Sequence, residues 1–148
     1  MMVLLHMTCS LLSYVAFLIA FLAGLLFLIQ ERQLKHKQMG WLFRRLPALR
    51  TLDRINVIAI GAGFCLLSLG VVLGVWGARA LLGDWWRWDP KETLTLVLWA
   101  SYLVLWLVRL RATLRGRKVA LLSILGFTLV LFTFVGVSRW LPTWHAYL

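Results

Sequence analysis

Four long apolar blocks dominate this sequence and limit what the chain can fold into. They cover about residues 3–29, 56–76, 94–111 and 119–138. A helix needs roughly 20 residues to cross a hydrocarbon core about 30 Å thick, and the blocks are close to that length. Because lipid cannot hydrogen-bond exposed backbone groups, helices that satisfy their own backbone are favoured there. The pattern therefore predicts an all-α integral membrane protein with about four transmembrane helices in a single membrane domain, residues 1–148.

The distribution of charge predicts how these helices are oriented. The formal net charge is +11, and 62% of the residues are hydrophobic, which excludes an ordinary soluble domain. Seven of the 16 Lys and Arg residues lie between the first and second blocks, five lie within residues 109–118, at the end of the third block and before the fourth, and four lie elsewhere. Because cationic loops stay in the cytoplasm, both termini and the loop over about residues 77–93 are expected on the outer face. The basic loops should rest on anionic lipid headgroups of the bilayer, and nucleic acid is not an expected partner.

The loop between the second and third blocks is unusually rich in aromatic side chains. Three tryptophans fall within four residues, at Trp85, Trp86 and Trp88. An interfacial aromatic belt does not require rings this close together. The following residues are explained as a helix start, with Asp89 as N-cap, Pro90 at the first helical position and Glu92 in a capping box. Helix building does not explain the tryptophans, which predict a flat aromatic binding surface.

Two histidines are predicted on the same face as these tryptophans. With four helices, the start of the first block, the tryptophan loop and the C-terminal tail share one side, which brings His6 and His145 together and excludes His36. Taken alone, His6 is more typical of a polar residue in the headgroup zone. Two imidazoles beside an aromatic surface suit a haem, whose propionates would meet cations. The cations available on this face are Arg79, Arg87, Lys91 and Arg139. A quinone or lipid headgroup would fit the aromatics and cations without needing two histidines.

Residues 85–93, Trp-Trp-Arg-Trp-Asp-Pro-Lys-Glu-Thr, closely resemble the WWD signature of haem-handling membrane proteins. Their ending resembles the CcsA (ResC-type) branch of cytochrome c biogenesis system II. Three other segments agree with that family: the histidine-bearing helix start at residues 5–14, the inner loop within residues 30–54, and the last helix and terminal motif at residues 126–147. The resemblance spans nearly the whole chain. Family members are usually longer, with further helices ahead of the one that carries the histidine. The chain therefore resembles their C-terminal part.

The resemblance implies a membrane subunit that binds haem b and presents it for covalent attachment to apocytochrome c. The axial ligands of the iron would be His6 and His145. The rest of the haem site would consist of Trp85, Trp86, Arg87, Trp88, Asp89 and Lys91. The implied partners are a Ccs1/ResB-like membrane protein and an apocytochrome whose thiols add to the haem vinyl groups. The membrane would be a bacterial inner membrane or a thylakoid, with the tryptophan loop facing the outside or lumen. No catalytic side chain is assigned, because the covalent chemistry belongs largely to the haem and the thiols.

One departure from the family pattern keeps other functions open. The family often has a histidine inside the helix after the WWD loop, where this chain has Leu107. A HemX-like membrane regulator of tetrapyrrole synthesis is one alternative, and a fragment of a longer CcsA protein without its own function is another. The intact tryptophan loop and the two outer histidines favour haem presentation.

Overall fold

The computed structural model describes residues 1–37, 40–83, 85, 88–110 and 116–136. The regular structure within these ranges is entirely helical, which confirms the predicted all-α class. The elements in chain order are α1 (Met2–Lys35), α2 (Trp41–Arg45), α3 (Leu49–Leu82), α4 (Pro90–Leu110), α5 (Arg117–Leu131) and the π-helix η1 (Phe132–Gly136).

Three of the described helices, α1, α3 and α4, are long and apolar enough to cross a membrane. The fourth predicted span corresponds to α5, which has 15 residues and is continued by the five residues of η1. With 34 residues each, α1 and α3 are about 51 Å long at 1.5 Å per residue. They are therefore longer than a hydrocarbon core of about 30 Å, and parts of both helices lie outside it. The chain is an all-α membrane protein.

The helices run further than the apolar blocks indicate. Helix α3 extends seven residues before and six residues after the predicted block, from Leu49 to Leu82. It ends at Gly83, whose φ of +80° is a left-handed conformation that glycine adopts without a steric penalty. Helix α4 begins at Pro90, so the connection occupies residues 83–89 instead of 77–93. Hydropathy reports which residues suit lipid, whereas the helix continues until its backbone is capped.

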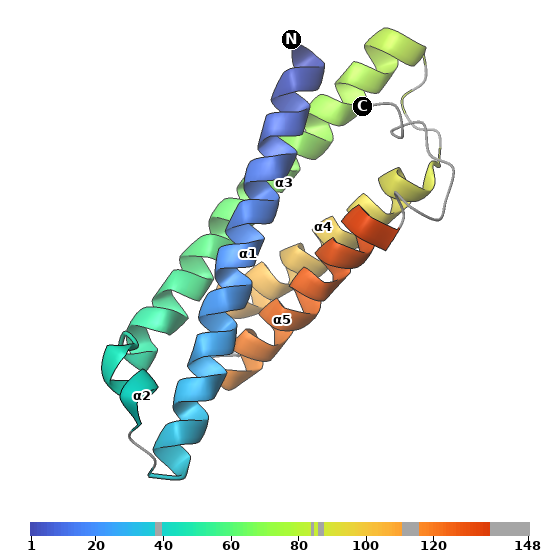
Figure 1. Cartoon of the computed structure of the whole chain (residues 1–148). Coiled ribbons are helices and arrows are strands. Elements are labelled where there is room, and N and C mark those ends of the chain that lie inside the picture. Colours follow the sequence, from blue (N-terminus) through green and yellow to red (C-terminus); the bar gives the residue numbers. More distant parts are fainter. Residues whose placement is uncertain (38–39, 84, 86–87, 111–115, 137–148) are drawn as a thin grey trace.

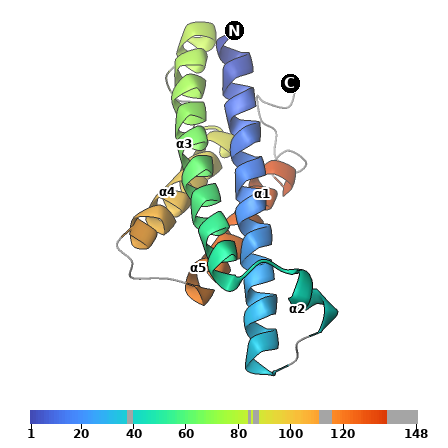
Figure 2. The same ribbon diagram turned by 90° about the vertical axis from the view of Figure 1, so that its left-hand side faces the viewer.

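The long helices α1 and α3 form an antiparallel pair, as Figures 1 and 2 show. Phe17 of α1 lies against Gly63 of α3, and Ala20 lies against Asn56. Helix α5 packs mainly against α1, and α4 packs against α3 and α5. In both views, the start of α1 and the end of α3 extend past α4 and α5.

Aromatic rings and glycines interlock in the core of the bundle. The rings of Phe17 and Tyr102 stack with their centroids 3.6 Å apart, and both side chains are buried. The Phe17 ring also faces Gly63, and the Trp106 ring faces Gly61. Small residues let membrane helices approach closely, which compensates for the absence of a hydrophobic driving force in lipid. Tyr102 and Trp106 of α4 thus pack against the neighbouring helices.

Asn56 of α3 connects three helices inside the bundle. Its side-chain amide nitrogen donates a hydrogen bond to the carbonyl oxygen of Ala20 in α1 at 2.6 Å. The same nitrogen lies 3.0 Å from the hydroxyl oxygen of Ser123 in α5. The side chain of Asn56 is buried, so these hydrogen bonds are shielded from water. An interhelical hydrogen bond in a membrane protein contributes about 0.6 kcal/mol on average and up to about 1.7 kcal/mol.

Asn56→Leu is therefore expected to destabilise the protein by about 1 to 2 kcal/mol, because it keeps the branched shape of the side chain but removes both interhelical hydrogen bonds. Unfolding of the purified protein by sodium dodecyl sulfate, followed by circular dichroism, would measure the change. Ser101→Ala is the matched control, since the Ser101 hydroxyl is exposed and bonds to Val97 within its own helix. Equal stability of the two variants would contradict a role for Asn56 in holding the helices together.

The two ends of the bundle differ in charge. The basic end contains the end of α1, helix α2, the start of α3, the end of α4 and the start of α5 (Figure 1). Its described cations are Arg32, Lys35, Lys37, Arg44, Arg45, Arg50, Arg54, Arg109, Arg117 and Lys118. The tryptophan end contains the start of α1, the end of α3, the start of α4 and η1, with Arg79 and Lys91 as its described cations. At the basic end, Arg109 of α4 forms an ion pair with Asp53 of α3.

Candidate functional site

The end of α3 holds the first tryptophan of the loop beside a cation. The guanidinium group of Arg79 donates a hydrogen bond to the carbonyl oxygen of Gly83, the residue that caps the helix. The same guanidinium lies over the ring of Trp85, 5.4 Å from its centroid, which is within the range of a cation–π contact. Trp85 is 54% exposed. The cap of α3 therefore positions a positive charge next to an accessible aromatic ring.

The other side of the connection is a helix start. The carbonyl oxygen of Asp89 accepts hydrogen bonds from the backbone N–H of Thr93 at 3.0 Å and from its hydroxyl at 3.2 Å. Asp89 is buried, and Pro90 is the first residue of α4, which confirms the predicted helix start. Lys91 follows within the first turn. The hydrogen bonds of the predicted capping box between the Asp89 and Glu92 side chains stay a prediction.

Trp88 has an unusual backbone conformation just before this helix start. Its φ is +56°, a left-handed value that costs a residue with a side chain about 1 to 2 kcal/mol. Its ring is 77% exposed, so burial of the ring does not explain the conformation. Strained residues of this kind cluster at sites that bind ligands. Trp88 is consistent with a residue placed for binding.

The side chain of His6, from α1, lies against α3 at Gly70 and Gly74. Its Nδ1 atom is 2.7 Å from the carbonyl oxygen of Gly70. A Cβ atom at Gly74 would lie 2.9 Å from both Nδ1 and Cε1 of the imidazole. The ring therefore rests on the backbone of α3, about two to three helical turns before Leu82, where that helix ends.

The structure places five of the eight predicted site residues at the tryptophan end. These are His6, Trp85, Trp88, Asp89 and Lys91. The other three, Trp86, Arg87 and His145, lie outside the described residues. The hydrogen-bond partner of His6 is on α3 and not on the loop. Gly70 and Gly74 were not predicted from the sequence as part of the site. Their spacing of four residues, which places both on one face of a helix, is the feature that could have indicated them.

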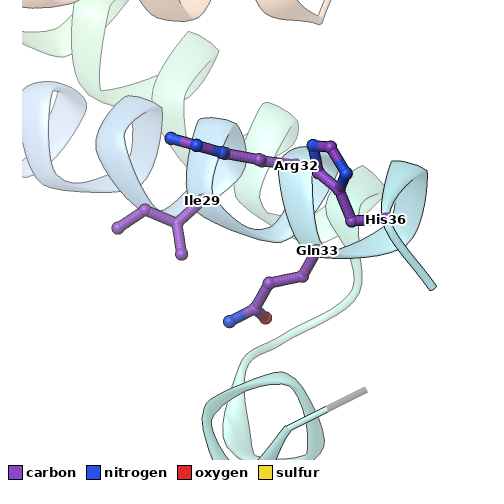
Figure 3. A pocket seen from close by; sticks show the side chains of 4 residues that line it. All are labelled: Ile29, Arg32, Gln33 and His36. Carbon is purple, nitrogen blue, oxygen red and sulfur yellow. The ribbon is translucent and has the colours of Figure 1, made fainter. Parts of the chain in front are cut away.

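An open pocket of about 420 Å³ lies at the basic end (Figure 3). It is lined by Ile29, Arg32, Gln33 and His36, all from the last turns of α1 and its C-cap. His36 thus lies at the opposite end of α1 from His6, as the sequence predicts. Its position makes His36 a control histidine for tests of His6.

Comparison with known proteins identifies the family. The family model described as "Cytochrome C assembly protein" matches residues 1–145 of this chain. The chain belongs to the cytochrome c assembly protein family. No solved structure matches it.

Curated relatives of this cytochrome c assembly family member are named "Cytochrome c biogenesis protein CcsA". That of Guillardia theta is 31% identical over 157 residues, which cover 96% of this chain and 52% of the relative. That of Chlamydomonas reinhardtii is 33% identical, over 96% of this chain and 39% of the relative. That of a Synechocystis strain is 38% identical, over 70% of this chain and 31% of the relative. The chain therefore spans about half the length of these relatives or less.

Leu107 marks the position at which the resemblance predicts a departure from the family. It lies in α4, and its side chain is 44% exposed. Its neighbour Trp106 turns towards α3 and packs against Gly61. In this member of the cytochrome c assembly family, position 107 thus contributes to the outer surface of the described bundle and not to its core.

Proposed function

We propose that this chain binds haem at its tryptophan end and presents it for attachment to apocytochrome c. The observation that carries the proposal is the contact between Nδ1 of His6 and the Gly70 carbonyl oxygen. Histidines that ligate metals commonly donate their other ring N–H to a backbone carbonyl in this way. The donor set fits haem, whose iron takes imidazole nitrogen as an axial ligand.

The aromatic and charged residues around the loop support the same ligand. The exposed rings of Trp85 and Trp88 offer flat apolar surface for a porphyrin face. Arg79 and Lys91 lie at the same end of the bundle and supply cations for its two propionates. Trp86, Arg87 and Asp89 complete the proposed surface. When bound, haem supplies the iron and the vinyl groups, and the side chains named here hold and orient it.

His145 is proposed as the second axial ligand. Helix η1 ends at Gly136, at the same end of the bundle as the start of α1 (Figure 1). His145 follows nine residues later in the sequence. Nine residues of extended chain span at most about 30 Å, so this histidine can reach the tryptophan end.

The charge difference between the two ends supports an orientation in the membrane. The basic end holds most of the described cations, and cation-rich segments remain on the cytoplasmic side. The tryptophan end would then face the periplasm, the outside or a thylakoid lumen. Haem bound there would be accessible to an apocytochrome on that side. A ResB-like membrane protein of system II is the proposed partner, and the relatives named CcsA support a role in cytochrome c biogenesis.

Absorption spectra of the purified protein, prepared in mild detergent from cells with ample haem, test the proposal. Wild type and His36→Ala are expected to show the bands of haem with two histidine ligands. His6→Ala and His145→Ala are expected to lose them, because each variant lacks one axial ligand. His36 is the matched control, since it lies at the opposite end of α1. A wild type without haem, or a His6→Ala protein with unchanged bands, would show that the ligand assignment is wrong.

A further inference from the structure

The His6 imidazole lies against the backbone of α3 at two neighbouring positions, Gly70 and Gly74. Its Nδ1 atom points to the carbonyl oxygen of Gly70 at 2.7 Å. The ring atoms nearest to a Cβ built at Gly74 are Cε1, Nδ1 and Cγ, at 2.9, 2.9 and 3.7 Å. The Nε2 atom lies farther from this position than those three atoms. One nitrogen of the ring is thus engaged with α3, and the other is directed away from Gly74.

We infer that the Gly70 carbonyl oxygen and the backbone at Gly74, which carries no side chain, are positioning elements for His6. They hold its imidazole with the hydrogen on Nδ1 and leave the Nε2 lone pair ready to bind iron. This inference rests on the proposed function, since it assigns Nε2 as the ligand atom. It extends that function by naming the residues that prepare the ligand before haem arrives.

Hydrogen-bond chemistry selects this tautomer. A neutral imidazole has one N–H group and one nitrogen with a lone pair, whereas a carbonyl oxygen can only accept a hydrogen bond. At 2.7 Å from the Gly70 oxygen, Nδ1 must therefore carry the hydrogen. The opposite tautomer would place two lone pairs against each other and would cover Nε2 with a hydrogen. The same contact fixes the plane of the ring, which reduces the ordering cost of ligation.

Glycine at position 74 gives the ring access to this carbonyl. A helix carbonyl already accepts one hydrogen bond from within its helix but has a second lone pair for another donor. Any side chain at position 74 would begin with a Cβ 2.9 Å from the ring, well inside the separation of about 3.5 to 4.0 Å at which nonbonded atoms attract. The imidazole would have to leave its place. Gly77, one turn further along α3, offers a control because a Cβ there meets no atom within 4 Å.

The first test measures the tautomer of the His6 imidazole in the haem-free protein. Nitrogen NMR of the haem-free protein, labelled with ¹⁵N-histidine in lipid nanodiscs, distinguishes a protonated from an unprotonated ring nitrogen. The His6 signals are assigned by their loss in His6→Gln. Wild type and Gly77→Ala are expected to show hydrogen on Nδ1 and a bare Nε2, whereas Gly74→Ala should lose this preference. Hydrogen on Nε2 in the wild type would overturn the inference, whatever the stability of the variants.

The second test is a haem titration of wild type, Gly74→Ala and Gly77→Ala. Disturbing a group that orients a metal ligand costs about 10- to 100-fold in affinity, and we expect a loss of that size for Gly74→Ala alone. Added free imidazole should restore part of its spectrum, because a free ligand does not need the position on α3. Equal haem affinity of the two variants would overturn the inference while the proposed function stands. A wild type that binds no haem but keeps hydrogen on Nδ1 would overturn the proposed function and still support the positioning of the ring.

Discussion

Replacing Gly63 by alanine is expected to destabilise the bundle by about 1 to 3 kcal/mol, the usual cost of adding a methyl group to a packed core. A Cβ at this position would lie 2.5 Å from Cε1 and 2.6 Å from Cδ1 of Phe17. The Phe17 ring has no room to retreat, because it is fully buried and stacked on Tyr102. Helices α1 and α3 would have to separate. Thermal unfolding of the purified protein in nanodiscs would measure the loss.

Gly77→Ala is the matched control for this prediction, since it changes the same residue type in the same helix. A Cβ at Gly77 meets no atom within 4 Å. Alanine is favoured over glycine in a helix interior by about 1 kcal/mol, so this variant should be as stable as the wild type or more stable. A Gly63→Ala protein as stable as Gly77→Ala would mean that the contact between Phe17 and Gly63 does not limit how closely the two helices approach.

The fold was predictable to the extent that it depends on local sequence. Apolar blocks predict the helices, and Asp89-Pro90 predicts where α4 begins. The full length of α3 was not predictable from hydropathy. Residues 77–82 include Arg79, yet they continue the helix, which is capped at Gly83. The apolar pattern reports contact with lipid, whereas the end of a helix depends on a backbone cap.

The site was predictable in its residue types but not in its contacts. Because successive membrane-spanning helices run in opposite directions, His6 is predicted at the tryptophan end, and the structure agrees. The position of His6 on Gly74 depends on the register between α1 and α3, which a single sequence does not contain. The contact between Arg79 and Trp85 likewise depends on how the chain turns at Gly83. Trp86, Arg87 and His145 lie outside the described residues, so their roles stay predictions.

Replacing Trp85 and Trp88 together by alanine is expected to lower haem affinity at least about tenfold while membrane insertion stays intact. Burying one large apolar side chain contributes about 1.5 to 3 kcal/mol, and 1.4 kcal/mol corresponds to a factor of ten in affinity. Both rings are more than half exposed, so their apolar area is available to a porphyrin. Haem titration of the purified variant would measure the change, and its yield in the membrane fraction would report insertion.

Trp41→Ala separates haem binding from a general effect of exposed tryptophans. Trp41 is 69% exposed, and the guanidinium of Arg45 lies 4.8 Å from its ring centroid. It therefore reproduces the pairing of Trp85 with Arg79, but at the basic end. Loss of haem from the Trp85→Ala/Trp88→Ala protein with full retention in Trp41→Ala would locate the haem at the tryptophan end. Unchanged affinity in the double variant would instead assign its rings to an aromatic belt that anchors the protein at the membrane surface.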